Sequence, residues 1–515
     1  MKQRLIKMKN ARNVILLGLL SLLSSCEPFY DPVANNDVSC SRGTAWQGDP
    51  IVVKKTVENP YTAADLTQTM PLSLLLDMAL YNNPSTRASW NAARASAYAY
   101  RAALSPYYPT LGYVGSLNAQ ANTGSTFATA GAGIVSTTTT NTTTPPPAYT
   151  TNLSNDLNLS YILLDFGGRN ATAELARQTL YASNWQHNYT MQEVMLSVLD
   201  AYTNYIGNQG LVVAYEENLK DAQVSLDAAK VMHKAGLSTL TDVLLAQSNL
   251  EQTRTSLIQA QGAEQTALGD VLITVGLPPD TEISLENLPQ KLPVIEISGN
   301  ISSLLETAKQ NRPDLGIAIA AIKQQEAELA ISYSTSMPIL TANANWNQIR
   351  FISPKKPSGY NSTAFLEVNF PIFQGFFFMN QQRQIRAQIE EALANLDVQV
   401  AAISTQVVTN YYAFTSAEAA LPSAEASLEY SQRAFRGVLV QYKTGTSSFL
   451  DVITAETVLN NARAQLVLTR TQWAASLANL AFSVGVLNDT GGRWQDGPPQ
   501  QLYQIPIRDD NENTK

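Results

Sequence analysis

The chain has 515 residues, a formal net charge of −8, and 45% hydrophobic and 15% charged residues. This acidic balance disfavours a nucleic-acid partner. Two histidines and two cysteines leave too few ligands for a zinc or copper site and too few thiols for a disulfide framework. Nucleophile-elbow and phosphate-loop patterns are also absent from the sequence, so we expect no enzyme activity, no cofactor and no metal.

The N-terminal residues 1–25 have the features of a secretory signal. Five cations precede an apolar run at 14–23, which is too short to span a bilayer as a mature helix. The run ends in Leu-Ser-Ser-Cys, which is similar to the lipobox of bacterial lipoproteins. We therefore expect lipidation of Cys26 and a lipidated N-terminal extension over 26–69. An ordinary cleaved signal with a chance cysteine is the alternative.

The remainder of the chain contains an internal repeat. The turn sequence around Gly236 recurs around Gly445, 209 residues later. Upstream, Pro84 corresponds to Pro313 at an offset of 229 residues, so the first repeat carries twenty extra residues between these points. They coincide with a Ser/Thr/Gly/Pro tract at 124–151, which we expect to be an exposed loop because it cannot bury a core.

The repeat predicts a division of the mature chain into four parts. Residues 70–280 form the first repeat, 281–300 a connecting segment, 301–487 the second repeat and 488–515 a C-terminal tail. Each repeat reads as a helix, two strands and a helical hairpin, so we expect a duplicated helix-strand-strand-helix-helix plan.

Four segments alternate apolar and polar residues with the period of two that indicates β-strands. They lie at 110–121, 157–161, 340–347 and 367–372. The clearest of them alternates leucine, alanine and tryptophan with threonine and asparagine from residue 340 onward. Such alternation fits either a soluble sheet over a core or a sheet that faces lipid.

Polar loops separate the two strands of each pair, at 124–151 and 352–362. Strands with long polar loops between them are typical of hairpins in outer-membrane barrels. Four strands alone would leave unpaired edges in lipid, so a membrane sheet predicts an oligomer. Three copies would supply about twelve strands, within the range of known outer-membrane barrels.

The segments between the strands are rich in Ala, Gln, Leu and Glu and predict long helices. Residues 169–234 and 376–443 each correspond to roughly 100 Å of α-helix. In each repeat two shorter helices together match the long one, so we expect one short helix beside its upper half and another beside its lower half. The shorter helices are expected at 72–104 and 239–274 in the first repeat and at 302–336 and 448–484 in the second.

Apolar residues recur every seven positions in both predicted hairpins, as they do in coiled coils. They are Val243, Leu250 and Leu257 in the first hairpin and Val452, Leu459 and Leu466 in the second. An ordinary core bundle is the alternative interpretation of the helices alone. Their length and the polarity of their other faces favour a less compact assembly.

The duplicated plan, the strand-to-helix turns at 163–168 and 371–375, and the glycine-containing hairpin tips resemble the TolC-type outer-membrane efflux protein family, in its lipidated branch. The resemblance covers about residues 70–487. It implies a mainly α chain with a membrane β-barrel portion, in a homotrimer that combines an α-barrel with a β-barrel of about twelve strands. The first hairpin would lie outside and the second inside.

The resemblance also implies a location and partners. The protein would be anchored by lipid in the outer membrane of a Gram-negative bacterium and would extend into the periplasm. It would bind outer-membrane lipid, a periplasmic adaptor and an inner-membrane pump, with no nucleic acid, and would conduct small molecules passively as the exit duct of a tripartite efflux system. The outer-membrane component of type I protein secretion, or a periplasmic coiled-coil adaptor or scaffold lipoprotein, are the alternatives.

A gate at the second hairpin tip is implied by the same resemblance. It would involve Tyr442 and Asp451, with Thr454 where the family can carry a second acid and Ser447 where an arginine can stand. Three Asp451 carboxylates at a constriction would favour cations, and their repulsion would oppose closure at neutral pH. The alternative for Asp451, as for Asp242 in the first repeat, is an acid that stabilises a helix N-terminus.

Both hairpin tips are the expected docking sites for the adaptor, and simple turn chemistry of glycine is the alternative interpretation. The tip residues are Gly236, Leu237 and Ser238 in the first hairpin and Gly445, Thr446 and Ser447 in the second.

Overall fold

The described part of the chain comes from a computed structural model. All described residues lie in one unit of the chain, Tyr61–Lys515. The expected signal, Cys26, most of the connecting segment and the tail lie outside the described residues. The structure describes residues 69–122, 148–279, 281, 283–286, 300–353 and 357–487.

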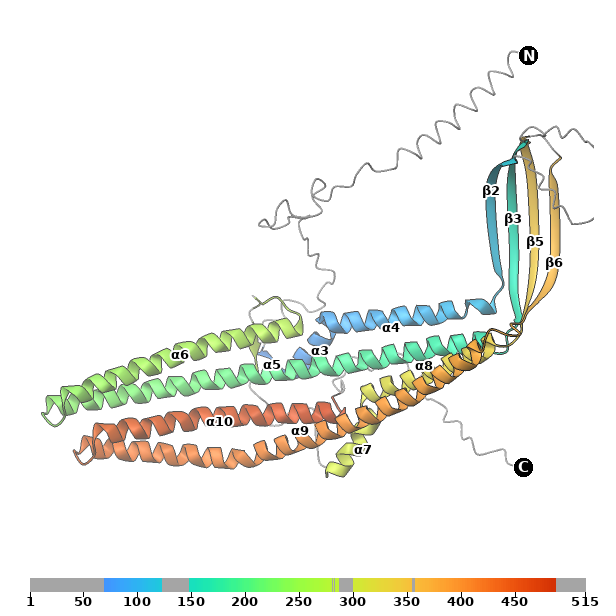
Figure 1. The fold of residues 1–515 in the computed structure, drawn as a ribbon. Helices are drawn as coiled ribbons and strands as arrows, with labels where there is room; N and C mark the ends of the chain where they lie inside the picture. The colour runs from blue at the N-terminus through green and yellow to red at the C-terminus, as the bar shows by residue number, and fades with distance from the viewer. Residues whose placement is uncertain are drawn as a thin grey trace, which may run out of the picture. The chain divides into compact units, whose positions relative to one another are not determined.

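The two repeats have the same order of elements (Figure 1). The first contains α3 (Leu72–Asn82), α4 (Pro84–Ala103), η1 (Ser105–Tyr107), β2 (Thr110–Asn122), β3 (Ala148–Leu164), α5 (Gly168–Lys234) and α6 (Leu240–Val275). The second contains α7 (Ile301–Asn311), α8 (Pro313–Thr335), β5 (Ile339–Ser353), β6 (Gly359–Asn369), α9 (Phe377–Lys443) and α10 (Phe449–Val484). The long helices α5 and α9 have 67 residues each, and α6 and α10 have 36 each.

The expected single helices at 72–104 and 302–336 are wrong, because each is broken into two. The residues before the prolines, Asn83 and Arg312, have extended backbones with ψ of 129° and 118°. A proline ring disfavours the helical conformation of the residue before it, whereas proline itself is well suited to the first helical position. The signal was therefore present in Pro84 and Pro313, which begin α4 and α8.

The long helices pair with the short ones as expected. Helix α5 packs against α4 and α6, and α9 packs against α8 and α10. Helix α5 also contacts α8 and α10, so it joins the two repeats. Of the six heptad positions, five are buried and Leu257 is only partly buried; the buried ones are Val243, Leu250, Val452, Leu459 and Leu466. In the described ranges, no helix combines the length and apolarity needed to cross a membrane.

Local sequence explains where the shorter hairpin helices begin and end. Capping boxes open α6 with Thr239 and α10 with Ser448, each paired with an aspartate three residues later. Gly276 and Gly485 end these helices with φ of 83° and 76°, a left-handed conformation that glycine adopts without strain. The backbone N–H of Val486 then donates to Ala481 O at 3.1 Å and satisfies a terminal carbonyl.

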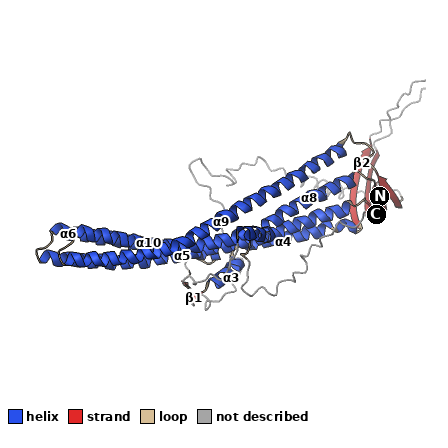
Figure 2. Cartoon of the chain, turned by 90° about the horizontal axis from the view of Figure 1, so that it is seen from below, coloured by secondary structure: helices blue, strands red, loops and turns tan. Residues whose placement is uncertain are grey.

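The four longer strands form one antiparallel sheet in the order β2-β3-β5-β6. Figure 2 shows them together, apart from the hairpin tips. The expected strand at 367–372 is partly wrong, since β6 ends at Asn369, and β3 begins earlier than expected, at Ala148. The expected loop at 352–362 is shorter, because β6 already starts at Gly359. A short parallel pair, β1 (Thr69–Met70) with β4 (Ser284–Leu285), was not expected.

Candidate functional site

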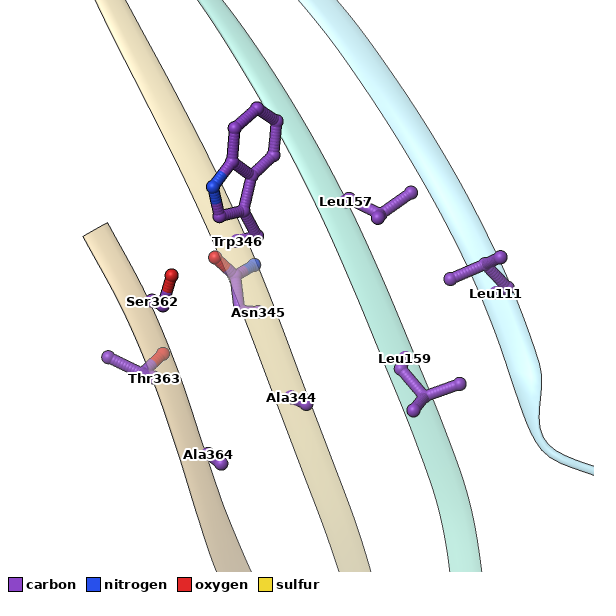
Figure 3. Close-up of a pocket in the computed structure, with 9 residues that line it drawn as sticks. All are labelled: Leu111, Leu157, Leu159, Ala344, Asn345, Trp346, Ser362, Thr363 and Ala364. Atoms are coloured by element: carbon purple, nitrogen blue, oxygen red, sulfur yellow. The ribbon is translucent and has the colours of Figure 1, made fainter. Parts of the chain in front are cut away.

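One face of the sheet is apolar and exposed. Cross-strand pairing places Leu159 between Leu111 and Ala344, and Leu157 beside Trp346. Figure 3 shows these side chains around a shallow hollow on neighbouring strands. Leu111 is 68% exposed, and the main helical contact of the sheet in the described chain is η1 against β3. Exposing such an apolar surface to water is unfavourable, whereas contact with lipid would bury it.

The opposite face of the sheet carries polar side chains that bond across strands. Asn347 Nδ2 donates to the Asp156 carboxylate, and Asn343 Nδ2 donates to Glu367 Oε2 at 3.2 Å. In the middle of β2, the hydroxyl of Ser116 lies 2.7 Å from that of Ser154 on β3. The alternation expected from the sequence is therefore confirmed within the predicted segments of β2, β3 and β5. Beyond these segments the apolar face also carries Asn155 and Gln348, and Asn155 Nδ2 donates to Gln348 Oε1 at 3.4 Å.

The sheet is open at both margins. Strand β2 pairs only with β3, and β6 pairs only with β5, among the described residues. A strand margin presents a row of backbone donors and acceptors, and hydrocarbon cannot satisfy them. A lipid-facing sheet of this kind therefore needs further strands from other chains to close it.

The strand-to-helix turns share an unusual backbone. Phe166 and Gly167 have φ of 49° and 92°, and Gly375 and Phe376 have φ of 60° and 66°. At the repeat offset of 209 residues, phenylalanine and glycine have exchanged places within the same left-handed pair. The turn geometry is thus common to both repeats even though its residue order is not.

Exposed aromatic and apolar side chains gather at these turns. Phe166, Ile372 and Phe373 are exposed, and the rings of Phe373 and Phe376 meet edge to face with centroids 5.5 Å apart. Aromatic residues are enriched where a membrane meets water. The turns therefore mark the boundary between the lipid-facing sheet and the helices.

At the second hairpin tip, Tyr442 is buried rather than presented to solvent. It is 3% exposed and packs against Phe449, with ring centroids 5.4 Å apart. Burial raises the pKa of its phenol. The turn itself is made by Gly445 with φ of 81°, after which Thr446 N donates to Gln441 O at 2.9 Å.

Asp451 lies in the first turn of α10 and is exposed. Its Oδ2 accepts from Ser448 N at 2.9 Å, from Ser448 Oγ at 2.7 Å and from Ser447 Oγ at 2.9 Å. These hydrogen bonds, led by the Ser448 hydroxyl, hold the pKa of Asp451 below its ordinary value. Thr454 instead donates to Leu450 O within its own helix, at 2.8 Å. The structure thus brings Asp451 together with Ser447 and gives it a capping role.

The first hairpin tip has the same cap with different side chains. Asp242 Oδ2 accepts from Thr239 N at 3.1 Å, and Gly236 has φ of 73°. The His233 ring donates from Nδ1 to Ser238 O at 3.0 Å. Leu237 is 69% exposed at the end of the turn. An exposed leucine at a tip is available for a partner.

Sequence reasoning missed a buried polar group between the hairpins, which we name the Glu456 cluster. Its members are Glu456 and Arg463 from α10, Asn218, Asp221 and Ser225 from α5, and Asn249 from α6. The signal was available, because positions 456 and 463 alternate with the buried heptad positions 452, 459 and 466. Polar residues at such seam positions specify pairing in coiled coils.

Among the described residues, no group of His, Cys, Asp and Glu is placed to hold a metal ion.

A two-faced open sheet joined to hairpins of this length defines a subunit of a membrane channel with a helical extension. The profile of the family described as "Outer membrane efflux protein" matches residues 75–272 and 304–486. Protein CyaE of Bordetella pertussis is 25% identical over 450 residues, which cover 85% of this chain and 88% of that protein. The probable efflux pump outer membrane protein TtgC of Pseudomonas putida is 23% identical, covering 85% of this chain and 86% of its own.

The fold agrees with solved structures. A structure of CusC superposes with a TM-score of 0.70 at 17% identity, covering 84% of this chain and 95% of that one. The chain belongs to the outer membrane efflux protein family. It is an efflux channel component located in the outer membrane, and the expected fold class and function are confirmed.

Proposed function

We propose that three copies of this chain form one passive exit duct for small molecules. Their sheets close a barrel of about twelve strands in the outer membrane, and their hairpins form a conduit toward the periplasm. The name of the TtgC relative, a probable efflux pump outer membrane protein, supports efflux as the transport that the duct serves. The duct performs no chemistry on what it conducts.

The observation that carries this proposal is the open sheet. It exposes an apolar face, it bonds polar side chains across the other face, and each of its marginal strands, β2 and β6, has one edge without a strand neighbour in the described chain. A soluble scaffold protein has no use for such a sheet, since both its apolar face and its margins favour aggregation in water.

Partners would meet the duct at the hairpin tips. Leu237 and Leu450 are 69% and 70% exposed, although each lies beside a well-formed turn. We infer that a periplasmic adaptor, working with an inner-membrane pump, covers these apolar side chains. Lipidation at Cys26 would hold the same assembly to the membrane surface, since the lipobox-like sequence precedes this residue.

The gate would lie at the second hairpin tip, where Asp451 is held ionised at neutral pH. Hydrogen bonds from Ser448 and Ser447 keep the pKa of its carboxyl low. Three such carboxylates around one axis attract cations and repel one another. Thr454 adds no charge, so this gate depends on a single acid in each chain.

The test is single-channel conductance of the purified trimer in a planar bilayer. Wild-type protein is expected to show small, cation-selective openings, and Asp451→Ala is expected to lose the cation selectivity. Asp242→Ala is the matched control, because it removes the same capping box from the first hairpin.

The outcomes separate the components of the proposal. Equal behaviour of Asp451→Ala and Asp242→Ala would show that Asp451 is only a cap. A folded trimer that never conducts would reject the gate assignment, and a protein that never inserts as a trimer would reject the duct.

A further inference from the structure

The carboxyl group of Glu456 is buried between the two hairpins and meets neutral partners. Its side chain is 1% exposed. Oε2 accepts from Ser225 Oγ at 2.6 Å, and Oε1 accepts from Asn249 Nδ2 at 2.7 Å. Ser225 belongs to α5 and Asn249 to α6, so one side chain of the second hairpin bonds both helices of the first.

The nearest cation in the Glu456 cluster is already paired. Arg463 Nη2 lies 2.7 Å from Asp221 Oδ2, and Arg463 Nη1 donates to Asn218 Oδ1 at 2.7 Å. Asp221 from α5 and Arg463 from α10 are the charged groups that act on Glu456, in opposite directions. Helix α9 faces this region with apolar residues that include Phe435.

These surroundings suit a neutral carboxylic acid. Burial raises the pKa of Glu456, and the hydrogen bonds from Ser225 and Asn249 offset only part of that effect. A protonated carboxyl needs an acceptor for its own hydrogen, and the Ser225 hydroxyl can accept as well as donate. An ionised carboxylate at the same place would be a buried charge whose partners are neutral.

We propose that Glu456 is a latch that holds the second hairpin against the first while it carries a proton, and that loss of the proton favours separation of the hairpins. Glu456 lies five residues beyond Asp451 in α10. Its side chain is buried, whereas that of Asp451 is exposed. The inference rests on the proposed duct, because separation of the hairpins would widen its periplasmic end.

The sign of the pH effect follows from linkage. A carboxyl with a higher pKa in the closed form stabilises that form fully below its open-state pKa, and this stabilisation is lost as the pH rises through the closed-state pKa. Each unit between the two values changes the ratio of open to closed forms by about tenfold. Conductance should therefore rise with pH above the ordinary glutamate range, because burial raises the pKa of Glu456 in the closed form.

The experiment measures single-channel conductance and open probability of the whole lipidated trimer against pH. Wild-type protein is expected to open more as the pH rises. Glu456→Gln is expected to stay at the low-pH level throughout, because an amide can donate to Ser225 and accept from Asn249 as the protonated acid does. Asp451 is ionised across this range, since its pKa is held low, so it does not contribute to the change.

Matched variants distinguish the latch from a general effect of pH on exposed carboxyl groups. Glu251→Gln removes an exposed carboxyl from α6 and is expected to keep the wild-type pH profile. If Glu456→Gln fails to assemble, Ser225→Ala is the second variant, and its transition should move to higher pH because the serine lowers the pKa of Glu456. A flat wild-type profile, or an unchanged profile in Glu456→Gln, would overturn the latch while leaving the duct intact. Failure of the wild-type protein to insert as a trimer would instead reject the duct.

Discussion

The two hairpins, α5 with α6 and α9 with α10, have equal helix lengths. They differ in the side chains along the seam of each, by which we mean the face of α6 or α10 that carries the heptad positions and the residues between them. In α10 the seam positions Glu456 and Arg463 are turned toward α5 and bond to it. At the repeat offset of 209 residues, α6 carries Gln247 and Arg254, and both are exposed in the described chain. The two repeats therefore share their helical scaffold, whereas α10 directs polar side chains toward the neighbouring hairpin where α6 has exposed ones.

The largest expected effect is a loss of stability at one of two glycines in the second repeat. Both glycines have a left-handed backbone, but their surroundings differ. At Gly485 an added Cβ would lie 3.0 Å from the Asn311 backbone, whereas at Gly445 it would meet open space. We expect Gly485→Ala to lower the free energy of unfolding by about 2–5 kcal/mol, because backbone strain and overpacking combine. Gly445→Ala should cost about 1–2 kcal/mol from strain alone. Urea unfolding followed by circular dichroism tests this, and equal losses would contradict it.

A smaller difference in the free energy of unfolding is expected between variants at Glu456 in α10 and at the equivalent Gln247 in α6. Glu456→Ala leaves the buried Ser225 and the partly buried Asn249 without their acceptor, so we expect a loss of about 1–3 kcal/mol in the free energy of unfolding. Gln247→Ala, at the exposed equivalent position, should change it by no more than about 0.5 kcal/mol. Unfolding of both variants under the same detergent conditions measures the difference. Similar losses would mean that the two seams do not differ energetically.

The smallest effect concerns the cap of α10. Because the pKa of Asp451 is lowered in the folded protein, its stabilising effect is present above the ordinary carboxyl range and is lost as the pH falls through the lowered pKa. We expect Asp451→Asn to lower the thermal midpoint slightly at neutral pH, and the difference from wild type to shrink in acid. A difference that grows in acid would show that the ionised carboxylate does not stabilise the cap.

The sequence was most informative where local chemistry and periodicity agree. The ends of α6 and α10 follow from their capping residues and terminal glycines, and the heptads identified the buried stripe. The helix breaks at Pro84 and Pro313 were predictable from proline chemistry but were obscured by the apolar pattern, which continues across them. The end of β6 was misplaced because the alternation of Phe370 and Ile372 continues beyond the last ladder hydrogen bonds.

Contacts between distant segments could not be obtained from the sequence of one chain. Nothing in the local sequence of Glu456 shows that Ser225, 231 residues away, donates to it. The burial of Tyr442 likewise depends on Phe449 and on the packing of the first hairpin beside it. The exchange of phenylalanine and glycine in the strand-to-helix turns became meaningful only once both residues were seen in the left-handed region.

The unpaired margins of β2 and β6 also constrain how the protein is made. Each free N–H or C=O group placed in hydrocarbon costs several kcal/mol, so a single copy cannot reside stably in the bilayer. Newly exported chains must therefore meet one another before or during entry into lipid. Their delivery to the membrane is a collective event, and an unaccompanied chain would remain outside the bilayer, accessible to chaperones and proteases.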